Sequence, residues 1–217
     1  DDIFEIWLEA NGYGDGYPQN DSVITATLVN IYSLNLFNKG IADLTGVGDM
    51  QNISELYAPY NNLTTVDLSS NTNLQYIYLD DNDSLSQIIL PDSSFYSGNI
   101  LYSLFASNCN ISTINLPNRE IKYISLSGNP LMNLDVSAVQ GLQELSVSQT
   151  NLTSLDLSNN TALQYLNCYD MDNLTELDLR NGLSLLNLSN ANIYNTPNLS
   201  CISVSDLTIG ASVLTNI

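Results

Sequence analysis

A leucine pattern that recurs about every 20 or 21 residues constrains this chain more than any other feature. Aligned on their apolar positions, six units follow one another at 53–73, 74–94, 101–120, 121–141, 142–162 and 163–182. A weaker copy precedes them at 31–52, another follows from Leu183 through Leu186, Leu188 and Ile193, and a further one begins at Leu199. A unit this short cannot bury its own apolar residues, so neighbouring units must stack to share a core. The repeat therefore predicts a solenoid.

Each unit carries the pattern L-x-x-L-x-L twice, as in Leu142, Leu145, Val147 and then Leu152, Leu155, Leu157. The alternation at the end of each trio is typical of a short strand with one buried face. No unit has helical apolar spacing over three turns, so the outer side should be strand or extended turn. We therefore expect a leucine-rich-repeat solenoid, mainly β, with short parallel strands on both broad faces and about eight rungs over residues 31–217.

Residues 1–30 lack the repeat and are expected to form an N-terminal cap made of a short helix and a loop. The segment 3–12 places Ile3, Ile6, Trp7 and Ala10 at helical spacing, and Gly12 is a suitable C-terminal stop. Such a helix would cover the open apolar end of the first rung. The last residues, 213–217, offer no comparable polar cap, so we expect the repeats to belong to a longer protein.

The charge balance excludes several kinds of partner. Four Lys and Arg stand against 23 Asp and Glu, which gives a formal net charge of −19. A surface this acidic repels phosphate backbones and anionic lipid headgroups, so we expect no nucleic-acid partner. No apolar run is long enough to span a bilayer, so membrane insertion is not expected either. The opening residues also lack the basic and apolar regions of a signal peptide.

The ninth position of the units indicates a structural role for several polar side chains. Asn61 and Asn129 occupy this position, where leucine-rich repeats commonly carry an asparagine that bonds backbone groups of the turn. Cys109 and Thr150 occupy it in other units, so we expect both to face inward. Cys168 falls at a core position and Cys201 at an outward position about two rungs away, so a disulfide between them is excluded.

Beyond the leucines, several stretches resemble secreted and cell-surface leucine-rich-repeat proteins of Bacteroidetes-type bacteria. They are FEIWLEANGYGDG at 4–16, GIADLTGV at 40–47, the NxLTxLDLSxNT repeats, and NLSCISVSD at 198–206. The resemblance covers nearly the whole chain and implies a signal peptide upstream, export across the cell envelope, and often a C-terminal sorting domain. It implies binding of protein or glycan and supplies no catalytic residues. This chain is richer in tyrosine and poorer in Cys and Gln than that group.

The residues between the leucines should form outward columns along the first-half sheet. One column reads Tyr57, Tyr78, Phe105, Ser125, Ser146, Asn167, and the other reads Glu55, Tyr76, Ser103, Tyr123, Glu144, Tyr165. Together they predict an exposed aromatic patch, bordered by Tyr60 and Tyr102 and extended by Tyr169. The candidate binding residues are Tyr57, Tyr76, Tyr78, Phe105, Tyr123 and Tyr165. Two interpretations stay open: the rings stabilise the sheet by stacking between rungs, or they bind a ligand.

The second-half column, Asp67, Ile89, Asn115, Asp135, Asp156 and Asp178, places carboxylates on successive rungs. The repeat consensus itself supplies these aspartates, so we interpret them as a structural, solvated row. Acidic turns at 80–83 and 170–173, and the loop at 11–21, could supply some oxygen ligands for calcium, although none has EF-hand spacing. The chain has no His and no activated nucleophile, so we expect neither an enzyme nor a cofactor.

These observations favour a monomeric, non-catalytic recognition module of a secreted or surface-exposed protein, with protein–protein adhesion through the tyrosine-rich face. An alternative is a glycan-binding or scaffold module of a larger exported enzyme, and a third is a structural spacer.

Overall fold

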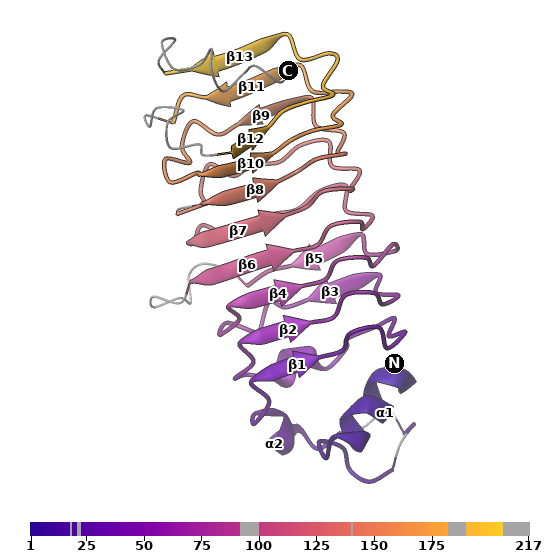
Figure 1. Cartoon of the computed structure of the whole chain (residues 1–217). Coiled ribbons are helices and arrows are strands. Elements are labelled where there is room, and N and C mark those ends of the chain that lie inside the picture. The colour runs from indigo at the N-terminus through magenta and orange to yellow at the C-terminus, as the bar shows by residue number, and fades with distance from the viewer. Residues whose placement is uncertain (18, 21–22, 92–99, 140, 182–189, 206–217) are drawn as a thin grey trace.

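One parallel eight-stranded sheet forms a broad face of the protein in the computed structural model. The structure describes the chain except for residues 18, 21–22, 92–99, 140, 182–189 and 206–217. The strands are β1 (Ser33–Asn35), β2 (Glu55–Tyr57), β4 (Tyr76–Tyr78), β6 (Leu101–Phe105), β7 (Ile121–Ser125), β8 (Glu144–Ser146), β10 (Tyr165–Asn167) and β12 (Asn190–Asn192). They pair in that order. Each comes from the next repeat, so the chain rises one rung per unit (Figure 1).

The opposite face carries strands from the second half of the units, in two separate sheets. The first contains β3 (Thr65–Asp67) and β5 (Gln87–Ile89), and the second contains β9 (Ser154–Asp156), β11 (Glu176–Leu179) and β13 (Cys201–Val204). Parallel strands on both faces confirm the expected fold class. In the two units between these sheets the corresponding segments, at 113–117 and 133–136, form no strand. Pro117 and Pro130 lie in this region and have no backbone N–H to donate to a ladder.

The leucine columns fill the space between the two faces, as the repeat predicts. Aligned positions such as Leu56, Ile77 and Leu104 are fully buried and lie opposite one another in neighbouring strands. Their burial forces the intervening residues outward, because successive side chains of a strand point to opposite faces. The expected rung through Leu183, Leu186 and Leu188 lies outside the described residues.

Buried asparagines tie the rungs together through backbone groups. The amide of Asn61 donates to the carbonyls of Leu36 and Ala58 at 2.8 and 3.0 Å, and its oxygen accepts the N–H of Ile41 at 3.0 Å. Asn129 bonds in the same way, which confirms the prediction for the ninth position. Asn82 does so too, with its amide bonded to the carbonyls of Ala58 and Leu79. From the sequence, Asn82 was expected only as part of an acidic turn, and this structural role was not predicted.

A second set of asparagines, which the sequence analysis did not identify, lies below the other face. Asn71 donates to the carbonyls of Val47 and Met50, and Asn160 donates to those of Val136 and Val139. Both side chains are buried, and each bridges back to the preceding rung. These residues are the N of the LSxNT segment of the repeat.

The N-terminal segment contains α1 (Asp2–Ala10) and α2 (Thr25–Leu28), and the short 3-10 helix η1 (Val47–Asp49) follows in the first repeat. Figure 1 shows α1 and α2 beyond the β1 end of the sheet. Phe4 and Leu8 of α1 join the buried core cluster with Leu28. The carboxylate of Asp1 accepts the N–H of Ala42 at 2.7 Å, which links the helix to the first repeat.

The prediction of a helix was confirmed, but the prediction of its buried face was wrong. Ile3 and Ile6 are 44% and 43% exposed, Ala10 is also exposed, and Trp7 is partly buried. The helix instead buries Phe4, Glu5 and Leu8. The carboxylate of Glu5 accepts the backbone N–H of Asn20 at 2.9 Å, and the carboxylate of Glu9 accepts that of Asp15 at 2.7 Å. These bonds hold Asp15 and Asn20 against the helix and fix which side of the helix faces the core.

Candidate functional site

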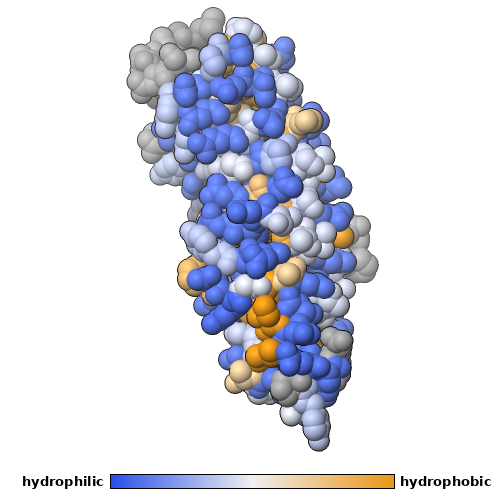
Figure 2. Space-filling model, turned by 90° about the vertical axis from the view of Figure 1, so that its right-hand side faces the viewer, coloured by the Kyte–Doolittle hydropathy of each residue, from blue (hydrophilic) through white to orange (hydrophobic). Residues whose placement is uncertain are grey.

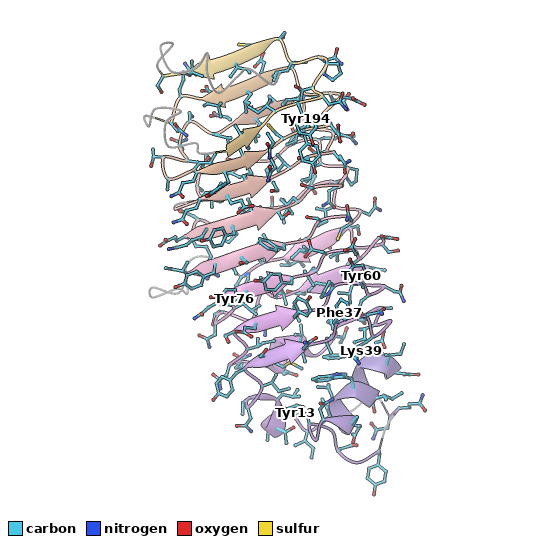
Figure 3. All side chains as sticks on the ribbon, viewed as in Figure 1. Tyr13, Phe37, Lys39, Tyr60, Tyr76 and Tyr194 are labelled. Atoms are coloured by element: carbon cyan, nitrogen blue, oxygen red, sulfur yellow. The ribbon has the colours of Figure 1, made fainter. Side chains whose placement is uncertain are left out.

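The eight-stranded sheet has both predicted columns in the predicted register, although Ser103, which was expected to be exposed, is buried. Tyr57 lies opposite Tyr78, and Tyr78 lies opposite Phe105. In the other column, Glu55 lies opposite Tyr76, and Glu144 lies between Tyr123 and Tyr165. Figure 3 shows Tyr76 over the sheet and Phe37 near its N-terminal end.

The aromatic residues of the first column form a continuous row of ring contacts. The ring centroids of Tyr57 and Tyr78 are 5.5 Å apart, and those of Tyr78 and Phe105 are 5.2 Å apart, both edge to face. Phe37, from the turn after β1, adds a fourth ring, which stacks on Tyr57 at 6.1 Å. We call Phe37, Tyr57, Tyr78 and Phe105 the aromatic row. Aromatic pairs at these distances are favourable beyond their buried area.

The second column brings some of the predicted residues together and leaves others apart. Tyr76 stacks on Tyr102 at 5.4 Å, and the ammonium of Lys122 lies 5.6 Å from the Tyr102 ring centroid. The Tyr123 hydroxyl donates to the Gln143 side chain at 3.3 Å. Tyr165 is separated from Tyr123 by the Glu144 rung, so it does not belong to the aromatic row.

The rings of the candidate residues are neither fully buried nor fully exposed to solvent. Tyr57 is 38% exposed and Tyr165 is 40% exposed, whereas Tyr76, Tyr78, Phe105 and Tyr123 are partly buried. This geometry is compatible with both a role in stabilising the sheet and a role in ligand binding, because contacts between rungs order the rings while their outer edges remain accessible. A rigid row of this kind needs little further ordering to bind a partner.

Further ring contacts, not predicted from the sequence, lie just beyond the strands. Phe37 and Tyr194 occupy the same place in their units, directly after the last core residue of the first half, and Tyr169 does too. Tyr169 and Tyr194 stack with centroids 4.9 Å apart and an angle of 2° between their planes. The sequence already placed Tyr169 next to the patch, and the same position in the other units identifies Phe37 and Tyr194.

The turn that follows each of these strands adopts a left-handed backbone. The φ angle is between 51° and 58° at Asn38, Tyr60, Asp81, Asn108, Gln149, Asp170 and Asn195, and it is 70° at Gly128. Side chains bond along this edge: the Asn108 amide donates to Asp81 at 2.9 Å, and the Gln149 amide donates to Asp170 at 3.3 Å. A hydrogen bond to Asp81 and the charge of that carboxylate raise the pKa of Tyr60. Figure 2 shows this flank as mostly hydrophilic, with apolar side chains gathered toward its N-terminal end.

The carboxylate column on the other face has a local structural role. Asp67, Asp135 and Asp156 each accept the backbone N–H of the serine two residues later, at 2.9 Å. Hydrogen bonds from Ser69 and Ser137 hold the pKa of Asp67 and Asp135 below the usual value. Within the described part of the chain, no group of three or more acidic or cysteine side chains is arranged to hold a metal ion.

The three cysteines are free thiols in different environments. Cys109 and Cys168 are buried, and burial raises the pKa of each to about 12. The Cys109 thiol lies 3.4 Å from the carbonyl of Leu79, as its ninth-position assignment predicted. Cys201 is exposed on β13. In the described residues, no helix is long and apolar enough to cross a membrane.

Comparison with known structures agrees with this architecture. Internalin C2 of Listeria monocytogenes superposes with a TM-score of 0.56 at 18% identity, covering 93% of this chain and 92% of that chain. The fold is that of a leucine-rich-repeat protein. The functional domain of internalin J from the same species gives a TM-score of 0.31 at 20% identity, covering 94% of this chain and 69% of that chain.

The sequence comparison is more local than the structural one. A stretch of 52 residues, or 24% of this leucine-rich-repeat chain, is 40% identical to internalin J of Listeria monocytogenes. That stretch spans 6% of the length of internalin J, so the activity of the whole relative does not transfer by itself. No family model matches the chain.

Proposed function

We propose that this chain is a non-catalytic recognition module of a secreted or surface-exposed bacterial protein, and that it binds a protein partner through the eight-stranded sheet. The aromatic row carries the proposal. Four rings from consecutive rungs contact one another and remain accessible at their outer edges.

The aromatic row offers a protein partner a rigid surface that is both apolar and able to form hydrogen bonds. Tyrosine supplies rigid apolar area together with a hydroxyl group, and tyrosines are enriched among the residues that dominate binding at protein interfaces. The strands that hold Tyr57, Tyr78 and Phe105 are paired on both sides, so the rings stand on a rigid surface. Little conformational entropy is therefore lost when a partner binds.

Two resemblances support the proposal that the protein is secreted or surface-exposed. The chain resembles secreted repeat proteins of Bacteroidetes-type bacteria, and one stretch matches internalin J of Listeria monocytogenes. We infer an exported protein from the first resemblance. The formal charge of −19 keeps such a chain soluble and disfavours binding to anionic membranes.

Replacing Tyr57, Tyr78 and Phe105 together by Ser tests the proposal. We expect the variant to lose capture of surface proteins from cells that live with the source bacterium, while it keeps its circular dichroism spectrum. A matched control replaces three exposed apolar residues away from this face, Tyr17, Ile89 and Met132, by Ser. Equal capture by the triple variant and the wild-type chain would exclude this face as the binding surface.

A glycan-binding or scaffold role within a larger exported enzyme is the second candidate. Exposed rings beside amides and carboxylates favour it, since sugars stack on rings and bond to such groups: Tyr194 is 47% exposed and precedes Asn195, which donates to Asp170. A glycan array with the intact chain separates the two candidates. Binding on the array that Tyr194→Ser abolishes and the triple variant retains would favour the glycan role.

A further inference from the structure

A hollow lies over strands β1, β2 and β4, at the N-terminal end of the aromatic face. It has a volume of about 400 Å³ and is lined by Ser33, Asn35, Glu55, Tyr57, Tyr76 and Tyr78. In the parallel register Glu55 lies opposite Tyr76, and Tyr57 lies opposite Tyr78. Four side chains thus stand at the corners of a square, with a tyrosine at three corners and a carboxylate at the fourth.

The carboxylate at the fourth corner is held by a neighbouring strand. The hydroxyl of Ser33 donates to the Oε2 atom of Glu55 at 2.9 Å. An ionised carboxylate can accept about four hydrogen bonds. This contact therefore orients Glu55 and still leaves it the capacity to accept two parallel bonds from a planar donor.

We infer that this hollow binds the guanidinium group of an arginine on the protein partner. The inference rests on the proposed function and names the partner chemistry of the same face. A guanidinium can stack on tyrosine rings and donate two parallel bonds to a carboxylate, and the hollow presents both features side by side. An ammonium group lacks the flat fork, so lysine fits the same surroundings less well.

Charge across the chain favours a basic partner. With 23 acidic and four basic side chains, the chain attracts a basic segment from a distance. The same face already holds one cation over a ring, since the ammonium of Lys122 lies 5.6 Å from the Tyr102 centroid. Lys122 is paired with Glu120 at 3.8 Å, so part of its charge is compensated.

The test uses the intact chain and a capped pentapeptide, Gly-Ser-Arg-Ser-Gly, with versions that carry lysine or citrulline in the place of arginine. Citrulline keeps the shape of arginine and removes its charge. Binding is followed by NMR of the tyrosine rings. We expect the arginine peptide to shift the rings of Tyr57, Tyr76 and Tyr78, with an affinity about fivefold above lysine and about tenfold above citrulline.

Two variants, each of which replaces one glutamate by the isosteric glutamine, distinguish binding at this hollow from electrostatic attraction to the whole acidic chain. Glu55→Gln should weaken the arginine peptide by about tenfold. Glu176→Gln, on β11 of the opposite face, should change the affinity by less than about twofold. Circular dichroism checks that both variants fold.

Three results would overturn the inference: no binding of the arginine peptide, equal binding of arginine and lysine peptides, or equal loss in the two variants. Any of these can occur while the Tyr57, Tyr78 and Phe105 variant still abolishes capture of a protein partner. In that case the recognition face stands and only its preference for arginine is wrong.

Discussion

Asn129 offers a sharp test of how the rungs are held together. Its side chain is 2% exposed. The amide donates to the carbonyls of Ala106 and Leu126 at 2.7 and 3.0 Å, and the oxygen accepts the N–H of Ile111 at 2.9 Å. Two of these bonds reach the preceding unit. Asn129→Ala therefore leaves three backbone groups without their partner.

The expected cost follows from the number of groups left unpaired. Each buried polar group that loses its partner costs about 1–3 kcal/mol, and water that enters at the edge recovers part of this. We expect Asn129→Ala to lower the free energy of unfolding by about 3 kcal/mol. Asn129→Thr should cost about half as much, because Thr150 occupies the same position and donates to the carbonyl of Val147 at 2.8 Å.

Urea unfolding and hydrogen exchange together measure this effect. With a slope of about 3 kcal/mol per molar urea, the midpoint should fall by about 1 M for Asn129→Ala. The amide of Ile111 should exchange about 100-fold faster, since it loses its acceptor. The reasoning is refuted if unfolding changes by less than about 0.5 kcal/mol and the Ile111 amide keeps its protection.

Three further predictions concern thiols, backbone and pH. A thiol reagent at mildly alkaline pH should label Cys201 in the folded chain and reach the two buried thiols only after unfolding; fast labelling of all three would contradict their burial. Gly128→Ala should destabilise the chain by about 1 kcal/mol in urea unfolding, because its φ is 70° and an added Cβ would lie 2.4 Å from the Asn108 side-chain oxygen. A stability equal to wild type would show that this turn relaxes freely. The hydrogen bonds that lower the pKa of Asp135 stabilise the fold above the unfolded pKa of about 4 and are lost as pH falls. Asp135→Ala should therefore lower the urea midpoint more near neutral pH than at about pH 3, and an equal effect at both pH values would exclude this linkage.

The sequence determined the repeat, the direction of each side chain in it, and the fold class. Once Leu56, Ile77 and Leu104 must face the core, period-two alternation places Tyr57, Tyr78 and Phe105 outside and in line. The two outward columns needed no tertiary information, because stacking of equal units carries each position onto its counterpart in the next rung. For the same reason the roles of Asn61 and Asn129 could be predicted from their place in the unit.

Only the tertiary structure decided which of these residues contact one another and which turns contribute side chains to the candidate site. The helix at 2–10 had two possible apolar stripes, and the bonds from its glutamates to the following loop selected the one with Phe4 and Leu8. Phe37 joins the aromatic row from a turn, where no strand alternation applies. The hollow at Glu55 arises from side chains of three strands, which lie about 20 residues apart in the sequence and meet only because neighbouring rungs are in register.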